Sequence, residues 1–291
     1  MTRYSFDWVD AFTSIAFGGN PCVVVYDADR ISIEDRMRLV RETRLSECAY
    51  IVPSEKADFG ARYYLTHAEI PLAGHPTIAT VASLISRGLV GPGSFTLEVG
   101  AGVLPIHVSD DLTITMTQRA PEFGQSVEPR AIADMYGLNA SDIIGTPQIV
   151  STGTAFCVTL LRDKDALRRA ELDPAKLGAF RNTIDHENAS ILEPFLVTLG
   201  GEEVGDTFSR LLLVPPMPPE DSFTGSATGC MAAYLWHHGY IENPRFVAEQ
   251  GHWMGRPGAA RVNVLGPRDA IVGVEVGGSG VVLMQGELVL D

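Results

Sequence analysis

The amino-acid sequence predicts an α+β protein built from two related halves. Many short segments are rich in β-branched and aromatic residues, as strands are. Two longer segments, one in each half, are apolar nearly all round, which is typical of buried helices. Similar motifs begin these two segments, which indicates a duplicated unit. Together these observations place the chain in the α+β class.

The first buried helix is expected to follow Ala73-Gly74-His75-Pro76-Thr77 and to reach Arg87. Proline is favoured at the first position of a helix, and a glycine such as Gly88 commonly ends one. The backbone N–H groups of a first helical turn have no partner within the helix. Beside a histidine, they predict an anion-binding site.

The second buried helix is expected to follow Thr224-Gly225-Ser226-Ala227-Thr228. Chance similarity between two core helices is the simpler explanation of the match. A duplication is favoured because glycines match at both ends of the two segments. In a duplicated fold, both helix N-termini can face one ligand. The matched pairs are Gly74 and Gly225, Thr77 and Thr228, Ala82 and Ala233, Leu84 and Leu235, and Gly88 and Gly239.

The composition is that of a protein with a substantial core. The chain has 291 residues, of which 45% are hydrophobic, and this length suits two domains. A net charge of −14 without a basic cluster disfavours binding to nucleic acid or anionic membranes. We find no signal peptide, no apolar run of about 18 residues and no C-x-x-C pair. We therefore expect a soluble cytoplasmic protein with reduced thiols.

The shorter elements follow from local patterns. Ser32 is expected to cap a helix that reaches Thr43, because acidic residues fill its first turn. Further helices are expected at 129–136, 163–170 and 174–181. The segment Pro215-Pro216-Met217-Pro218-Pro219 is expected to be a loop. Strands are expected at 4–13, 22–26, 49–52, 61–67, 94–98, 103–108, 112–117, 148–152, 155–161, 208–214, 245–249, 260–264, 271–276 and 281–290.

A connector at Gln118-Arg119-Ala120-Pro121 predicts a domain boundary. We place an N-terminal domain at residues 1–119 and a C-terminal domain at residues 120–278. The last strand, within residues 279–291, is expected to close the sheet of the first domain.

Four side chains beside turns are the candidates for chemistry, namely Glu47, His75, Asp221 and Ser226. Each has a structural alternative. A lone glutamate is usually exposed, a histidine or serine at a helix start can be a cap, and Asp221 can be a plain loop residue. The sequence has no metal-ligand spacing, no nucleotide-binding loop and no nucleophile elbow. We therefore expect no metal and no cofactor.

The candidates belong to a longer series of motifs. In chain order, the motifs are Phe17-Gly18-Gly19-Asn20-Pro21, Leu45-Ser46-Glu47, Glu69 through Thr77, Glu220-Asp221 through Thr224-Gly225-Ser226-Ala227, and Gln250-Gly251 through Met254-Gly255-Arg256-Pro257. In these motifs and their order, the chain resembles the PhzF-like phenazine-biosynthesis family, which has the diaminopimelate epimerase-like fold. The resemblance covers essentially the whole chain.

The resemblance implies two pseudo-symmetric domains, each a barrel-like β-sheet around one central helix, with the active site between them. It also implies a cofactor-free isomerisation that uses Glu47, His75, Asp221 and Ser226 as site residues. A homodimer is expected on the same ground.

Related epimerases instead use two cysteines at the starts of the central helices. A two-thiol racemase is not expected here. Cys48 follows Glu47 on a strand and should point to its opposite face, and Cys230 lies one turn inside its helix.

The chain departs from the family pattern next to the site. The changes concern Cys48-Ala49-Tyr50, Thr66-His67-Ala68 and Ser222-Phe223. Because they flank the expected site, they bear on the substrate more than on the chemistry.

The expected mechanism starts from a carboxylate in a closed cleft. Burial raises the pKa of a carboxyl, which suits Glu47 to take a proton from carbon and return it elsewhere on the substrate. Asp221 and His75 would hold an amine or a hydroxyl. The N–H groups at Gly74-His75 and Gly225-Ser226 would bind a substrate carboxylate.

The anion site thus predicts a small-molecule carboxylate as the ligand, and the resemblance implies a small cyclic amino-carboxylate such as a dihydro-hydroxyanthranilate. Neither nucleic acid nor membrane is an expected partner. Two alternatives remain open at this point. One is an epimerase or another proton-transfer enzyme acting on a small amino acid derivative, and the other is a binding protein of the same fold without turnover.

Overall fold

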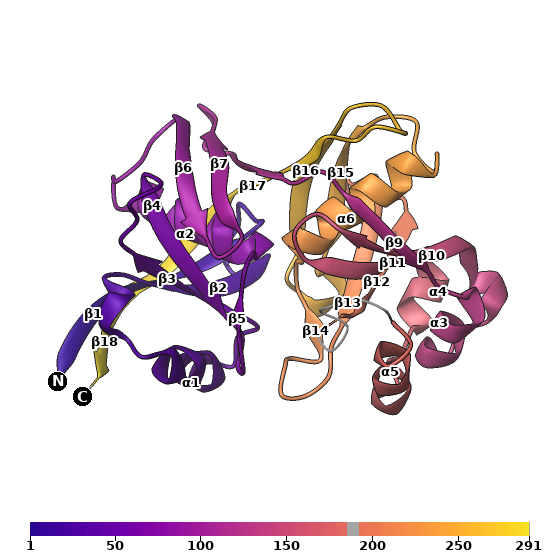
Figure 1. Cartoon of the computed structure of the whole chain (residues 1–291), viewed down its shortest axis with the longest axis horizontal. Coiled ribbons are helices and arrows are strands. Elements are labelled where there is room, and N and C mark those ends of the chain that lie inside the picture. Colours follow the sequence, from indigo (N-terminus) through magenta and orange to yellow (C-terminus); the bar gives the residue numbers. More distant parts are fainter. Residues whose placement is uncertain (185–191, 291) are drawn as a thin grey trace.

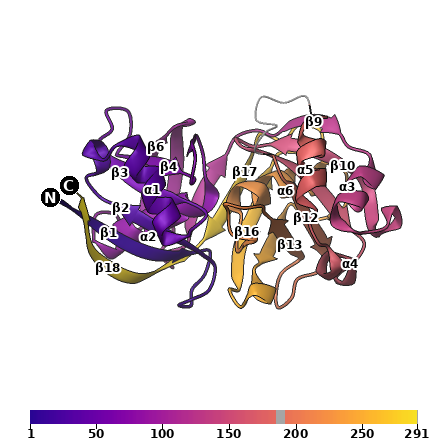
Figure 2. The same cartoon turned by 90° about the horizontal axis from the view of Figure 1, so that it is seen from below.

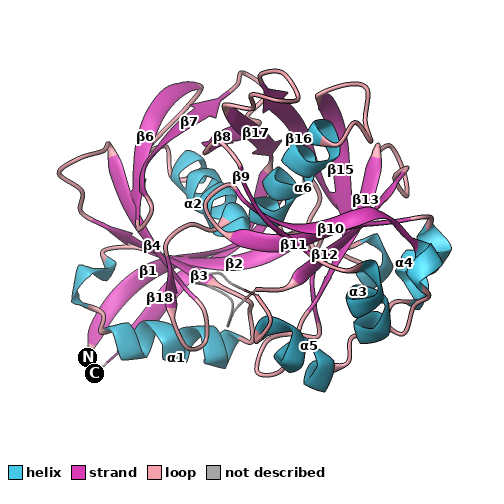
Figure 3. Cartoon of the chain, turned by 45° about the vertical axis from the view of Figure 1, so that its right-hand side comes forward, coloured by secondary structure: helices cyan, strands magenta, loops and turns pink. Residues whose placement is uncertain are grey.

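A computed structural model describes residues 1–184 and 192–290 (Figure 1). Two lobes lie side by side, and each contains one central helix. Helix α2 (Gly74–Ser86) lies in the first lobe and helix α6 (Gly225–His237) lies in the second. Figure 3 shows both helices among strands, with the shorter helices on the outside of the molecule.

The first lobe is a curved sheet around α2. Strand β1 pairs antiparallel with β2 and with β18, which comes from the other end of the chain. Strand β3 runs parallel to β2 and antiparallel to β4, and β6 runs parallel to β4. The elements are β1 (Thr2–Ala11), β2 (Asn20–Val25), α1 (Ile33–Thr43), β3 (Cys48–Val52), β4 (Phe59–Tyr64), β5 (Glu69–Ile70), β6 (Gly93–Val99), β7 (Gly102–Val108), β8 (Ile114–Gln118) and β18 (Gly280–Leu290).

The second lobe repeats this plan. Strand β12 runs parallel to β11 and antiparallel to β13, and β15 runs parallel to β13. Strand β17 pairs with β8 of the first lobe and so joins the two sheets. The elements are β9 (Glu122–Ser126), α3 (Pro129–Tyr136), β10 (Ile143–Ser151), β11 (Ala155–Leu161), α4 (Lys164–Arg169), α5 (Pro174–Arg181), β12 (Pro194–Leu199), β13 (Thr207–Leu212), β14 (Glu220–Asp221), β15 (Arg245–Gln250), β16 (Gly258–Leu265) and β17 (Gly273–Gly278).

The predicted α+β class with two similar halves is confirmed. The expected ends of the central helices are also seen, since Gly88 and Gly239 follow them with φ of 68° and 73°. An equivalent hydrogen bond opens each helix. Thr77 Oγ1 donates to the carbonyl of Ala73 over 2.6 Å, and Thr228 Oγ1 donates to that of Thr224 over 3.0 Å.

The N-termini of the two helices meet at the centre of the molecule. A Cβ atom on Gly74 would lie 2.5 Å from the backbone nitrogen of Ser226 and 2.6 Å from the Cα of Gly225. Only glycine permits this approach, because any side chain would overlap the facing backbone. The two glycines of the motifs therefore bring the helix starts together.

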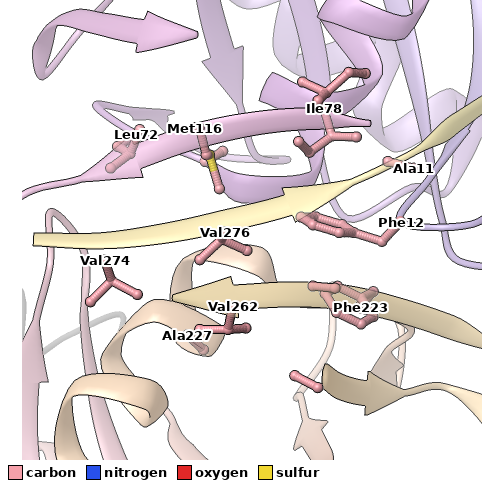
Figure 4. Close-up of a cluster of buried hydrophobic side chains, with 14 of the residues drawn as sticks. Ala11, Phe12, Leu72, Ile78, Met116, Phe223, Ala227, Val262, Val274 and Val276 are labelled. Carbon is pink, nitrogen blue, oxygen red and sulfur yellow. The ribbon is translucent and has the colours of Figure 1, made fainter. Parts of the chain in front are cut away.

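One hydrophobic core extends across both lobes. Figure 4 shows side chains of the two halves in one cluster, among them Ile78 of α2, Ala227 of α6 and Val276 of β17. Phe12 and Phe223 stack with ring centroids 4.3 Å apart at an interplanar angle of 25°. Burial of this shared apolar surface fixes the position of one lobe on the other.

Some expectations about elements need correction. The sequence patterns missed β9 and β12 and the two-residue strands β5 and β14. The expected strand at 112–117 begins at Ile114, because Leu112 lies in a turn with φ of 60°. The domain limits at residues 119 and 278 remain a prediction. Within the described residues, no helix combines the length and apolarity that crossing a bilayer requires.

Candidate active site

A cavity of about 370 Å³ lies between the lobes, with walls from both halves. This volume is at the small end of the range of about 300–1,000 Å³ that ligand pockets occupy. Most of the lining is apolar and includes Leu72, Phe156 and Met217. The polar lining residues are Ser46, Glu47, His67, Thr154, Arg181, Glu193, Asp221, Thr224 and Ser226.

Glu47 lies in this wall, directly before β3. Its side chain is 19% exposed, and its Oε2 atom is buried without a hydrogen-bond partner among the described residues. Burial raises the pKa of this carboxyl well above its ordinary value, and the charges of Asp221 and Glu193 raise it further. A carboxyl whose pKa is raised in this way can hold a proton that an exposed glutamate would have lost.

His75 lies behind Glu47, at the start of α2. Its Nδ1 atom is 3.8 Å from Oε2 of Glu47, and only 2% of the residue is exposed. Burial lowers the pKa of the imidazole to about 3, so the ring is neutral and the contact is not an ion pair. The sequence analysis expected His75 in the wall of the site, but the residue is not part of the cavity lining.

Asp221 forms part of the cavity wall and is held by two donors. Asn20 Nδ2 donates to its Oδ1 over 2.8 Å, and Thr224 Oγ1 donates to its Oδ2 over 2.7 Å. Burial raises the pKa of Asp221 to about 6, and the hydrogen bonds from Thr224 and Asn20 oppose part of this rise.

Arg256 holds the glycine-rich turn that leads to Asn20. The Arg256 guanidinium donates to the carbonyls of Gly18 and Gly19 and to Oδ1 of the fully buried Asp10. A residue of the second half thus fixes a turn of the first half. That turn presents Asn20 to Asp221 of the second half.

The helix starts supply the remaining polar wall. Ser226 lines the cavity, whereas Gly74 and Gly225 pack against each other between the helices. Neither Ala73 nor Thr224 caps its helix with a side-chain hydrogen bond. At Ser226, where α6 lines the cavity, first-turn N–H groups can therefore donate to an anionic ligand.

Two charged residues of the wall were missed by the sequence analysis. Arg181, at the end of α5, donates from Nη2 to Oε1 of Glu193 over 2.8 Å and from Nε to the carbonyl of Leu192. Burial raises the pKa of Glu193 to about 7, although Arg181 favours its ionised form. The apolar run that follows Glu193 was the only sequence signal for it.

The cysteines lie away from the cavity lining. Burial raises the pKa of Cys48 to about 12 and that of Cys230 to about 11, so both thiols are protonated. A two-thiol mechanism therefore has no support in this geometry. No three His, Cys, Asp or Glu side chains among the described residues gather as metal ligands would.

Comparison with known proteins gives matches over nearly the whole chain. The family model described as "Phenazine biosynthesis-like protein" matches residues 9–286. An uncharacterized isomerase from Salmonella typhimurium, YddE, is 32% identical over 294 residues, which are 96% of each chain. The trans-2,3-dihydro-3-hydroxyanthranilate isomerase of Pseudomonas chlororaphis is 28% identical over 289 residues, which are 97% of this chain and 98% of that one.

Structural comparison agrees with these matches. The crystal structure of a PhzF-family phenazine biosynthesis protein from Bacillus anthracis superposes with a TM-score of 0.85 at 25% identity, over the full length of both chains. The relatives are named as isomerases, and the chain is an enzyme of that class. On its motifs, its fold and this end-to-end similarity, the chain belongs to the phenazine biosynthesis-like protein family.

Proposed function

We propose that the protein is a cofactor-independent isomerase that moves a proton within a small cyclic amino-carboxylate, with Glu47 as the proton shuttle. One observation carries the proposal. Glu47 presents a carboxyl in a largely apolar cavity, beside the neutral His75, and its buried Oε2 has no hydrogen-bond partner among the described residues. Burial without a partner costs free energy, and a role in proton transfer would account for a carboxyl kept in this state.

The reaction is a balanced proton shift. Ionised Glu47 takes a proton from a substrate carbon, and the electron pair of that bond is delocalised over the adjacent double bond. The protonated Glu47 then returns a proton to another carbon, so the substrate is neither oxidised nor reduced. The largely apolar lining of the cavity limits the water that can reach these steps.

The remaining polar groups orient the substrate. The start of α6 at Ser226 binds its carboxylate, and Asp221 holds its amine or hydroxyl. The substrate class is inferred from the relative named trans-2,3-dihydro-3-hydroxyanthranilate isomerase. A homodimer and a cytoplasmic location remain predictions.

Substitution of Glu47 by Gln tests the proposal. Glutamine keeps the size of the side chain but cannot exchange a proton with carbon. We expect proton NMR in D₂O with trans-2,3-dihydro-3-hydroxyanthranilate to show a rate loss of about 100-fold or more, the scale of acid–base catalysis. Ligand binding should be largely retained. Glu55→Gln, at an exposed glutamate, serves as the control. A Glu47→Gln variant as fast as this control would contradict the proposal.

A further inference from the structure

The fold places Glu47 and Glu193 at equivalent positions of the two halves. Glu47 directly precedes β3, which lies between the parallel strand β2 and the antiparallel strand β4. Glu193 directly precedes β12, which lies between the parallel strand β11 and the antiparallel strand β13. The two glutamates thus enter corresponding strands of the repeated sheet.

The strand registers make this equivalence specific. In the first half, Cys48 is opposite Tyr64, and Tyr64 is opposite Glu69. Glu69 stands five residues before Gly74, the first residue of α2. Glu47 is therefore linked to the start of α2 through two strand pairings.

The second half contains the same links. Glu220 stands five residues before Gly225, the first residue of α6, and it is opposite Leu212. The register of β12 and β13 aligns Leu196 with Arg210, and its continuation by two residues brings Pro194 opposite Leu212. Pro194 is thus the counterpart of Cys48, and Glu193 is the counterpart of Glu47.

Both glutamates line the same cavity and are sheltered to the same degree. Their side chains are 19% and 18% exposed. They also influence each other, because the charge of Glu193 contributes to the raised pKa of Glu47. The repeat of the fold in the two lobes therefore places one carboxyl of each lobe in the wall of the same cavity.

We propose that Glu193 is a second catalytic acid–base residue, so that Glu47 and Glu193 act on the bound substrate from the two lobes. This inference rests on the proposed proton-transfer function. It replaces a single shuttle by a pair of carboxyl groups.

The two groups exchange protonation states during each turnover. One carboxylate removes a proton from a substrate carbon, and the electron pair stays in the substrate. The other, protonated carboxyl delivers a different proton to the same or another carbon. Solvent then restores the starting protonation states. Arg181, bonded to Glu193, favours its ionised form between these steps.

A structural role for Glu193 is the competing explanation, because it forms an ion pair with Arg181 at 2.8 Å. Glu98 provides the matched control. Its side chain is 16% exposed and paired with Arg62 at 3.3 Å, but it is outside the cavity lining. Glu98→Gln removes a Glu–Arg pair of similar exposure outside the cavity, whereas Glu193→Gln also removes a carboxyl from the cavity wall. Comparison of the two variants therefore separates the effect of the ion pair from that of the carboxyl.

The experiment compares exchange with conversion. The probe is trans-2,3-dihydro-3-hydroxyanthranilate, followed by proton NMR in D₂O. Glu193→Gln should lower conversion to product by about 100-fold or more. In this variant Glu47 should still remove the substrate hydrogen, so that deuterium from the solvent replaces it. Glu47→Gln should lose both exchange and conversion, and Glu98→Gln should keep both. Glu193→Asp, which retains a carboxyl, should recover part of the conversion and shows that the site is folded.

An isotope measurement on the unmodified protein provides a test that needs no variant. Substrate deuterated at the reacting carbon is converted in H₂O, and the product should contain solvent hydrogen at the new position. Deuterium carried into the product would overturn the two-carboxyl inference, as would a Glu193→Gln variant that converts as fast as Glu98→Gln. If the unmodified protein neither converts the probe nor exchanges any of its carbon-bound hydrogen, the proposed function itself fails, and the inference fails with it.

Discussion

At the scale of single residues, Glu193 and Glu98 should affect stability with opposite pH dependence. The pKa of Glu193 is raised to about 7 by burial, whereas the hydrogen bond from Ser54 lowers the pKa of Glu98. A group with a raised folded-state pKa stabilises the protein most below its unfolded value. Its contribution is lost as pH rises through the folded value. For Glu193 this window extends from 4.5 to about 7.

Urea unfolding between pH 3 and pH 8 should reveal this difference. Relative to the unmodified protein, Glu193→Gln should gain about 2 kcal/mol of unfolding free energy as pH rises through the window. The full linkage value over this window is about 3.5 kcal/mol, at about 1.4 kcal/mol per pH unit, and the expected gain is smaller because the side chain is partly exposed. Glu98→Gln should lose stability as pH rises through the region below 4.5. Parallel curves for the two variants would contradict the burial of Glu193 as an acid.

The sequence predicted only part of the site, for reasons that lie in single residues. Asp221, Ser226 and Glu47 follow turns or motifs and lie in the cavity wall as expected. His75 is recognisable for the same reason, but its place behind Glu47 depends on packing. Glu193 has no motif. The spacing between the two glutamates also differs from the spacing between the two helices, so the strand registers are needed to match them.

At the scale of elements, the contact of α2 with α6 should depend on Gly74. Alanine at this position would place a Cβ 2.5 Å from the backbone of Ser226, where no side chain can move aside. We expect Gly74→Ala to lower the unfolding free energy by about 1–3 kcal/mol, the usual cost of overpacking. It should also reduce activity, because the added Cβ would displace Ser226, which lines the cavity.

Gly178 is the matched control for this substitution. It lies in α5, is exposed, and a Cβ there would meet no atom within 4 Å. Gly178→Ala should be neutral or gain up to about 1 kcal/mol, since alanine favours helix. Chemical denaturation of both variants compares them directly. Equal effects would show that the helix starts tolerate separation.

The elements themselves were predictable where local pattern decides them. The cap of α1 is one case, because Ser32 accepts a hydrogen bond from the backbone of Asp35 as its sequence context indicates. Strand β12 was missed, since it begins with a proline and is held by its neighbours β11 and β13. Strands of two residues, such as β14, have no pattern of their own and exist only through pairing.

At the scale of the whole molecule, Arg256 should connect the two lobes. It pairs with Asp10 at 2.7 Å, and Asp10 is fully buried. Arg256→Gln would leave this carboxylate without its cation, which typically costs about 3–5 kcal/mol. The turn with Asn20 should then become less ordered, and the hydrogen bond from Asn20 to Asp221 should weaken. We therefore expect loss of both thermal stability and activity.

The exposed pair of Arg3 and Glu287 is the comparison for this prediction. Both side chains are more than half exposed, at 67% and 55%. Arg3→Gln should change the unfolding free energy by less than about 0.5 kcal/mol, as surface substitutions usually do. Calorimetry of the two variants measures the difference. Similar melting temperatures would show that the Arg256 contact does not hold the lobes.

The pairing of β1 with β18 also makes the chain suitable for circular permutation. Thr2 is opposite Leu290 in this ladder, and Figure 2 shows the two termini close together. A short flexible linker between them would therefore close the chain into a ring without strain. New termini between Gly91 and Pro92, in an exposed loop after α2, would open that ring away from the cavity. Such a circular permutant would exchange the order of the strands along the chain and leave every wall of the site in place.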